Sequence, residues 1–573
     1  MLGESKSIPE KRDRGYSKRL IIILASLLSA VHCKMIPQRA TISGFVWSDQ
    51  GPVEGAIVRI QTTSLSALSD RSGKFVLRRI PANRALALTA CAPGFLIAGP
   101  LIAGEGASDV HFVLKRHAEK DHPEYQWISA FRKDGESGNC ENCHSDPNHP
   151  NSTLPFDEWK RDAHGMSSSN PRFLSIYRGT DLGGTRSSPK TRYSLDRDYG
   201  RFPRPPDPGE AYYGPGYLLD GFSSPGDCAA CHVPAAAAGA PYHTEPAAET
   251  PAHRESVACD LCHKIWAVKL DPATGSPRPN MPGVMSIEFR RPEKGHQLFI
   301  GPHDDVAPGE DTYSPLQKKS QICAPCHFAE FWGVQVYNSY GEWLASPYSD
   351  PQTGQTCQDC HMPRRGARLI ALPEKGGLIR NSKTIFSHLM PGASDEAFLR
   401  DTAKLEIEGR IRENRLHVNV RVTNVKGGHH IPTDHPARNI LLVVNATDSR
   451  GRPLEDLGNQ KIPEWGGQGG GEDDYAGRPG KGYAKILEEL WTEVSPSAAY
   501  WRQTRLKSDT RIPAKATDLT QYVFRPPDDE GPAHVHARLI FRRAFISLKR
   551  QKSWIDPDIV MNESKISISP RGH

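Results

Sequence analysis

A chain of 573 residues is too long for one ordinary domain, and its 50 glycines and 48 prolines indicate many loops between short elements. The formal net charge of +6 is small and spread along the chain, which argues against a partner such as nucleic acid or an anionic membrane face. The 12 cysteines and 23 histidines are the unusual part of the composition, because ten of the cysteines form five pairs at i, i+3.

Residues 1–33 have the pattern of an export signal. A basic stretch ends at Arg19, and the apolar run over 20–31 is too short to span a bilayer but has the length of a signal-peptide core. Ala30 is a candidate cleavage-site residue. Two alternatives stay open, a lipidated Cys33 and an uncleaved N-terminal anchor. Every version predicts a periplasmic or extracellular protein, with possible attachment to a membrane or the cell surface.

Residues 38–117 are predicted to form a β-sandwich, because short alternating runs separated by turns recur at 41–47, 56–60 and 69–77. The segment resembles the carboxypeptidase regulatory-like domain in five places: Ile42-Ser-Gly44, Pro52 to Ala56, Asp70 with Gly73-Lys-Phe75, Ile80-Pro81 and Gly94-Phe95. That resemblance implies a structural or adhesive module rather than a catalytic one. Cys91 lies in one of the strands and is expected to be a buried small apolar residue.

Residues 118–397 contain five C-x-x-C-H motifs in a loop-rich segment that we expect to be mainly α. The motifs are Cys140–Cys143–His144, Cys228–Cys231–His232, Cys259–Cys262–His263, Cys323–Cys326–His327 and Cys357–Cys360–His361. Two cysteines three residues apart lie on one side of a helical turn and can form thioethers to the two vinyl groups of one haem, while the next histidine ligates the iron. Zinc sites would not need a histidine after every pair, and five i, i+3 disulfides have no rationale. The motifs therefore predict five covalently bound c-type haems, which would themselves form much of the core.

Each haem iron needs a second axial ligand if it is to carry electrons without binding substrate, and mainly bis-histidine ligation is expected. The distal candidates are, in order, His164, His388 and His430, followed by His253, His243, His303, His296 and His429. Three further histidines lie on predicted strands and are interpreted as ordinary surface residues: His417, His534 and His536.

A faint internal repeat bears on whether one haem has an open face. Trp159 and His164 follow the first motif, and Trp343 and Tyr348 follow the fourth motif at nearly the same spacing. If the segments are equivalent, Tyr348 stands where His164 does, and it becomes the candidate catalytic residue of an open site. The other interpretation is an accidental sequence echo.

Residues 398–573 are predicted to form a second β-sandwich, from alternating strands near 404–411, 416–422, 439–445 and 534–541. A turn is expected at Arg412-Glu-Asn, and a short helix at about 480–495.

The segment 138–440 resembles the multihaem cytochrome c superfamily, which includes pentahaem nitrite reductases and hydroxylamine oxidoreductases. The matching pieces are the first motif with Trp159 and His164, Cys259-Asp-Leu-Cys-His-Lys264, and Glu342-Trp with Cys357-Gln-Asp-Cys-His-Met-Pro363. The resemblance implies closely stacked haems that conduct electrons. Nitrite reductases of this superfamily typically have a C-x-x-C-K catalytic haem, whereas all five motifs here end in histidine.

Three functions are compatible with these patterns. The first is an electron-transfer protein whose partners are redox proteins, either other cytochromes or a quinol-linked donor. The second is a reductase of a small nitrogen or sulfur oxyanion at one open-site haem. The third is an adhesive or filament-forming extracellular cytochrome.

Overall fold

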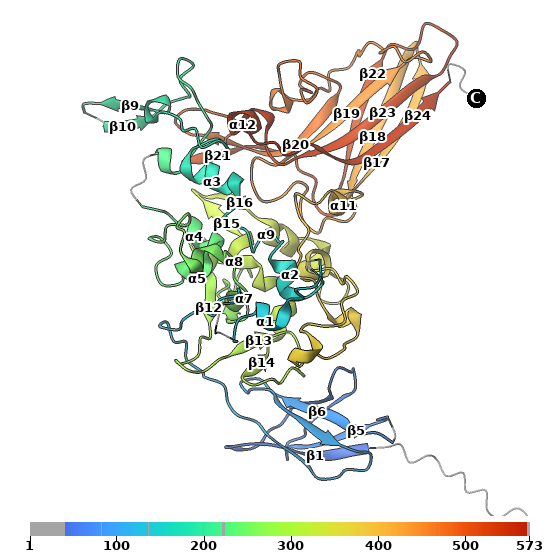
Figure 1. The fold of residues 1–573 in the computed structure, drawn as a ribbon. Coiled ribbons are helices and arrows are strands. Elements are labelled where there is room, and N and C mark those ends of the chain that lie inside the picture. The colour runs from blue at the N-terminus through green and yellow to red at the C-terminus, as the bar shows by residue number, and fades with distance from the viewer. Residues whose placement is uncertain are drawn as a thin grey trace, which may run out of the picture.

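The computed structural model describes residues 41–569, apart from 82, 134, 136, 150, 199 and 221–223. The predicted export signal, with Ala30 and Cys33, lies outside the described residues. Within the described part of the chain, no helix is both long and apolar enough to cross a membrane. Figure 1 shows a β-sandwich at each end of the molecule and a region of short helices and loops between them.

The N-terminal β-sandwich matches the expectation from the alternating pattern. Its strands are β1 (Thr41–Ser48), β2 (Gly51–Pro52), β3 (Ile57–Ile60), β4 (Ser66–Leu68), β5 (Lys74–Arg78), β6 (Leu86–Cys91), β7 (Ala98–Ala103) and β8 (Val110–Val113). One sheet has the order β2-β1-β5 with β8 parallel to β1, and the other has the order β4-β3-β6-β7. The inward side chains of the two sheets, among them Ile42, Phe75 and Phe112, form one apolar core. Cys91 is 2% exposed, as predicted for a small core residue.

The middle region is loop-rich, and its helices are short. They are α1 (Glu141–His144), α2 (Pro155–Trp159), α3 (Pro171–Arg178), α4 (Cys228–His232), α5 (Pro234–Ala237), α6 (Pro251–Arg254), α7 (Cys259–Cys262), α8 (Ala324–His327), α9 (Ser339–Leu344), α10 (Cys357–His361) and α11 (Glu396–Leu399). Four two-stranded sheets accompany them: β9 (Tyr193–Asp196) with β10 (Gly200–Pro203), β11 (Ile265–Val268) with β12 (Ile287–Phe289), β13 (Phe299–Gly301) with β14 (Asp311–Tyr313), and β15 (Ala329–Phe331) with β16 (Val334–Tyr337). Several helices begin with proline, which fits the first helical turn but cannot continue a preceding helix.

The C-terminal β-sandwich has two antiparallel sheets of three and five strands. The strands are β17 (Ala403–Arg412), β18 (Arg415–Asn424), β19 (Asn439–Thr447), β20 (Gly480–Glu489), β21 (Thr504–Asp509), β22 (Thr517–Phe524), β23 (Ala533–Arg542) and β24 (Ile559–Ile568), with α12 (Ile546–Gln551) outside the sheets. The sheet orders are β17-β18-β22 and β21-β20-β19-β23-β24. The predicted turn joins β17 to β18 through Glu413 and Asn414, whose φ values of 49° and 56° suit a two-residue hairpin.

The helix expected at 480–495 is wrong, because the segment contains strand β20. Its residues 480–484 pair with β19 and its residues 485–489 pair with β21, and nearly all of them are buried. Its sequence does not alternate between apolar and polar residues, because Lys485, Glu488 and Glu489 are buried together with the apolar ones, so the period-2 signal of a strand is missing. The division of the chain at residues 117/118 and 397/398 stays a prediction.

Polar contacts fix both sandwiches to the middle region. Arg59 of the N-terminal sandwich forms two hydrogen bonds with the carboxylate of Asp304, at 2.6 and 2.7 Å. At the other end, Lys485 Nζ donates to the backbone carbonyls of Gln335 and Val336 at 2.7 and 2.9 Å. The segment that carries the motifs is therefore held between two rigid β structures.

Candidate functional site

All five C-x-x-C-H motifs lie on short helical segments of the middle region, namely α1, α4, α7, α8 and α10 (Figure 1). A helical turn puts both cysteines of each motif on one side, as the haem interpretation requires. The structure describes all ten motif cysteines, and none of them is joined in a disulfide. Among the described residues, no three or more His, Cys, Asp or Glu side chains form a cluster that could hold a bare metal ion.

The histidine that ends each motif has its Nδ1 atom held by another part of the chain. The five contacts are His144 to Ile370 O (2.5 Å), His232 to Ser167 O (3.3 Å), His263 to Ile300 O (2.9 Å), His327 to Asp434 Oδ2 (3.2 Å) and His361 to Pro391 O (2.8 Å). An Nδ1–H that donates to an oxygen fixes the tautomer and leaves Nε2 with its lone pair for a metal. Aromatic rings also restrain two of the imidazoles, because Phe173 stacks on His232 at 3.8 Å and Phe299 stacks on His263 at 4.0 Å.

The protonation of these imidazoles follows from burial and from one carboxylate. Burial lowers the pKa of His144, and it lowers the pKa of His232 to about 4, of His263 to about 3 and of His361 to about 4. Neutral imidazole is the form that binds iron. Burial also acts to lower the pKa of His327, but the hydrogen bond to Asp434 outweighs it and raises the value to about 9.

Two of the motif histidines face a second histidine at a distance that suits a shared metal ion. The ring centroids of His164 and His327 are 6.3 Å apart, and those of His361 and His429 are also 6.3 Å apart. Two imidazoles that coordinate one metal from opposite sides, each with a metal–nitrogen distance of about 2.0 Å, have centroids about 6.3 Å apart. The geometry therefore brings His164 to the fourth motif rather than to the first, which is its neighbour in sequence.

The position of His429 differs from the order of the sequence-based candidates, which placed His430 ahead of it. The backbone N–H of His430 donates to Glu342 Oε2 at 3.2 Å, and its Nδ1 lies 3.7 Å from Glu342 Oε1. Because the two histidines are adjacent, the sequence gives no reason to prefer either one. Only the fold shows which ring faces His361.

The other predicted distal histidines lie in different surroundings. Burial, with a smaller effect of the nearby His144, lowers the pKa of His388 to about 4, so these two imidazoles are neighbours. The Nε2 atom of His253 is buried without a hydrogen-bond partner. His303 lies near Arg380 and Asp305, where the N-terminal sandwich meets the middle region.

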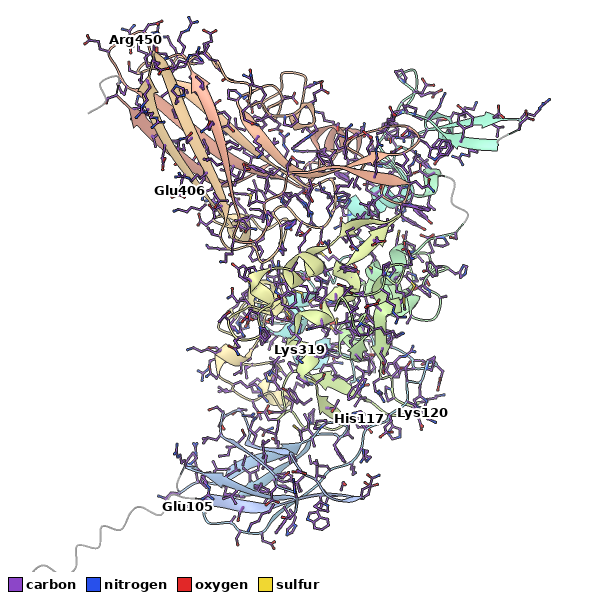
Figure 2. All side chains as sticks on the ribbon, turned by 180° about the vertical axis from the view of Figure 1, so that it is seen from behind. Glu105, His117, Lys120, Lys319, Glu406 and Arg450 are labelled. Carbon is purple, nitrogen blue, oxygen red and sulfur yellow. The ribbon has the colours of Figure 1, made fainter. Side chains whose placement is uncertain are left out.

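His117 is a candidate that the sequence analysis missed. Its Nδ1 donates to the Ala118 carbonyl at 2.8 Å, and its Nε2 is buried without a partner. Figure 2 shows His117 where the N-terminal sandwich joins the middle region. It lies on the linker that follows β8, so no motif marked it, and only its burial identifies it.

The internal repeat is visible in the structure, and the role of Tyr348 at an open haem face stays a prediction. Glu158 accepts the backbone N–H of His388 at 2.7 Å, just as Glu342 accepts that of His430, so the two Glu-Trp segments hold equivalent histidine loops. The Tyr348 hydroxyl donates to the Val425 carbonyl at 3.1 Å. That hydrogen bond fixes the hydroxyl against the backbone of the segment that follows β18.

Thiols of different motifs are in contact, which shows which motifs are neighbours in space. The pKa of Cys259 is raised by the thiol of Cys140, that of Cys231 by the thiol of Cys326, and that of Cys323 by the thiol of Cys357, so each pair lies close together. The fourth motif therefore contacts both the second and the fifth, and the first motif contacts the third.

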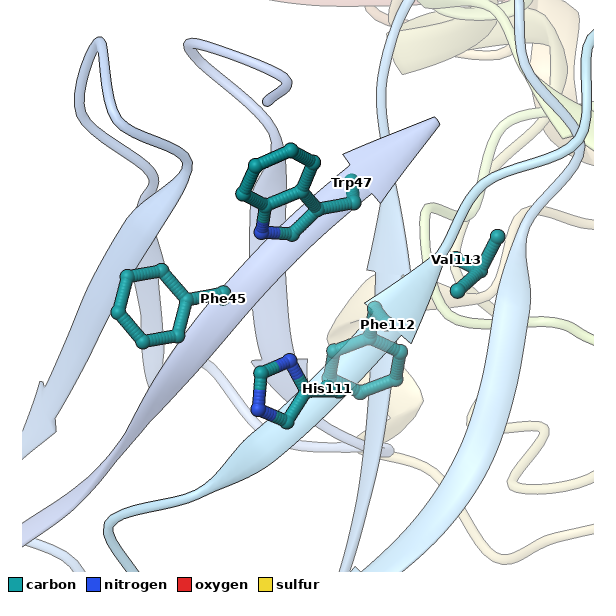
Figure 3. A pocket seen from close by; sticks show the side chains of 5 residues that line it. All are labelled: Phe45, Trp47, His111, Phe112 and Val113. Carbon is teal, nitrogen blue, oxygen red and sulfur yellow. The ribbon is translucent and has the colours of Figure 1, made fainter. Parts of the chain in front are cut away.

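A separate pocket of about 330 Å³ lies on the N-terminal sandwich (Figure 3). Its lining includes Phe45 and His111, whose rings stack at 5.6 Å, and Trp47, which is 43% exposed. It contains no residue of the five motifs, so the metal chemistry of the chain belongs to the middle region.

No family model matches the chain, and no curated protein matches it. The chain is similar to the crystal structure of a penta-haem cytochrome c552 from Thermochromatium tepidum, at 19% identity and a TM-score of 0.49, over 75% of this chain and 97% of that chain. A cohesin–X-dockerin complex from Acetivibrio cellulolyticus matches 14% of this chain and 58% of that chain, at 17% identity and a TM-score of 0.12. These TM-scores are too low to support a functional argument, which has to come from the residues of this chain.

Proposed function

We propose that this chain is an exported pentahaem c-type cytochrome that transfers electrons through five covalently bound, mainly bis-histidine haems. The observation that carries the proposal is that every C-x-x-C-H histidine has its Nδ1 held by an oxygen and its Nε2 left for a metal. Two of the five face a second imidazole at the spacing of a bis-histidine site.

The residues present fit haem groups in number and chemistry. The ten motif cysteines would form the thioethers, and His144, His232, His263, His327 and His361 would be the proximal ligands. His164 and His429 are the distal ligands that geometry supports for the fourth and fifth motifs, and His388 is the candidate for the first. His253 and His117 are candidates for the remaining two, with His430 and His303 behind them.

The bound haems would supply one-electron chemistry, because their irons cycle between the ferric and ferrous states. Burial would hold the imidazoles of His144, His232, His263 and His361 neutral, and the Nδ1 contacts would fix the orientation of all five rings. The thiol contacts support an order in which the fourth haem lies beside the second and the fifth, while the first lies beside the third.

The site of action and the partners follow from the covalent attachment and the sequence. Haem attachment to C-x-x-C-H occurs outside the cytoplasm, which agrees with the predicted export signal and a periplasmic or extracellular location. The partners would be redox proteins, either other cytochromes or a quinol-linked donor, and the two sandwiches would serve docking or attachment to the cell surface.

The test is to produce the full chain in a host that attaches haem and to count covalent haems by intact mass and absorbance. We expect five haems and all-low-spin iron in the EPR spectrum of the oxidised protein. The double variant Cys323→Ser with Cys326→Ser should lose one haem, while Cys91→Ser, a cysteine outside the motifs, should keep all five. A wild-type protein without covalent haem would refute the proposal.

One observation favours a second candidate function, a multihaem reductase of a small nitrogen or sulfur oxyanion. The Tyr337 hydroxyl donates to that of Tyr500 at 2.6 Å, and the ring of His435 lies 6.0 Å from the Tyr500 ring. Burial raises the pKa of Tyr337 above its ordinary value, with smaller contributions from Asp434 and Cys228, so this phenol keeps its proton and lies near groups of the second and fourth motifs. High-spin iron, together with turnover of nitrite or hydroxylamine by the viologen-reduced protein, would support this function over simple electron transfer.

A further inference from the structure

One proximal histidine differs from the other four in the oxygen that holds it. His144, His232, His263 and His361 each donate to a neutral backbone carbonyl, whereas His327 donates to the carboxylate of Asp434. The difference lies at the fourth motif, whose thiols contact those of the second and fifth motifs. The Asp434 contact is therefore at the motif whose thiols lie close to those of two other motifs.

Asp434 is held in place by several contacts. Its side chain is 13% exposed, and its Oδ1 accepts hydrogen bonds from the hydroxyl and the backbone N–H of Ser339, at 2.7 and 3.3 Å. Its φ of 60° places the residue in the left-handed region, which aspartate tolerates better than most residues. Oδ2 is left to accept from His327, and the C-terminal part of the chain thereby supplies a group to a motif in the middle region.

A carboxylate that accepts a hydrogen bond from an iron-bound imidazole affects the iron in two ways. It makes the imidazole a stronger electron donor, and it places a negative charge close to the metal. Both effects stabilise the ferric state, which carries one more positive charge than the ferrous state. Apart from His327, Arg438 is the cation that lowers the pKa of Asp434 most. Its Nη1 donates to the Thr433 carbonyl at 3.1 Å, so this hydrogen bond does not go to the carboxylate.

We propose that Asp434 is a positioning residue that gives the haem of Cys323, Cys326 and His327 the lowest reduction potential of the five. The inference rests on the proposed function, since it requires haem at this motif. When bound, this haem would gain one electron as a ferrous neighbour became ferric, with no covalent bond or proton changing place. The thiols of this motif lie close to those of the second and fifth motifs, which would place its haem between theirs, so Asp434 would set the uphill step on that route.

The experiment is a spectroelectrochemical titration of the holoprotein and of Asp434→Asn, which keeps the shape and an accepting oxygen but removes the charge. We expect five haems in both proteins. At a fixed applied potential, the ferrous-to-ferric ratio of one haem should be at least ten times higher in the variant. This corresponds to a rise of about 59 mV in the reduction potential of that haem. The EPR signal of one low-spin haem should change with it, a readout that a purely structural role would not produce.

The matched control is Asp157→Asn. Asp157 is buried beside the first motif and accepts from the Ser145 hydroxyl at 2.6 Å, but it does not hold the proximal His144. At a fixed applied potential, we expect the ferrous-to-ferric ratio of each of its five haems to stay within a factor of three of the wild-type value. A shift as large as that in Asp434→Asn would overturn the inference, because any buried charge would then have the same effect.

Ser339→Ala gives an independent test with the opposite sign. Without the Ser339 hydroxyl, the Asp434 carboxylate becomes a stronger acceptor for His327, so the same potential should fall. Unchanged or raised potentials in this variant, or unchanged potentials in Asp434→Asn with five haems bound, would overturn the inference alone. A wild-type chain without covalent haem would overturn the proposed function and the inference together.

Discussion

Replacement of His429 by alanine tests the ligand assignment at the last motif. The rings of His361 and His429 are inclined by 20°, and their centroids lie 6.3 Å apart, which leaves room for one iron at about 2.0 Å from each nitrogen. We therefore expect His429→Ala to open one position on one of five haems. About a fifth of the iron should change from low spin to high spin. EPR spectroscopy of the oxidised protein, with quantified spins, measures this fraction.

The neighbouring residue provides the matched control. The Nδ1 of His430 lies 3.7 Å from Glu342 Oε1, so its ring is directed to that carboxylate, and His430→Ala should leave the haem of the fifth motif low spin. Both variants remove one imidazole from the same loop, and any general loosening of that loop would affect them alike. High-spin iron in His430→Ala, with none in His429→Ala, would refute the geometric argument.

Two further predictions concern the junction between the N-terminal sandwich and the middle region. Asp305→Ala should lower the free energy of unfolding by about 3–5 kcal/mol, because it leaves buried Arg380 without its carboxylate at 2.8 Å. Chemical denaturation followed by circular dichroism measures this, and Glu396→Gln, in the exposed pair with Arg400, should change it by less than about 1 kcal/mol. Burial raises the pKa of Asp311 to about 7, above the unfolded value, so its contribution to stability is present at low pH and is lost as pH rises through 7. At pH 8, the free energy of unfolding of Asp311→Asn should therefore exceed that of the wild type by up to about 4 kcal/mol. The difference should disappear near pH 4.

Either result at the junction can go against the reasoning. An Asp305→Ala variant as stable as Glu396→Gln would show that solvent replaces the lost carboxylate. An Asp311→Asn variant with the same advantage at pH 4 and pH 8 would show that packing, rather than ionisation, sets its stability.

The sequence alone was sufficient where the information is local. The spacing of each C-x-x-C-H motif selects a helical turn, and all five motifs lie on such turns. Strict alternation predicted β17 and β18, together with the Glu413-Asn414 turn between them, because a strand with one buried face repeats every two residues. The same rule failed for β20, which is buried on both faces and has no alternation.

The tertiary structure decided how the local pieces combine. His164 faces His327, 163 residues away in the chain, and not the motif beside it. His429 rather than His430 faces His361, and Asp434 reaches His327 across the boundary with the C-terminal part of the chain. A ligand pair or a supporting carboxylate depends on where two distant backbones meet. No spacing along the sequence encodes that meeting, whereas the covalent chemistry of each motif is contained in five consecutive residues.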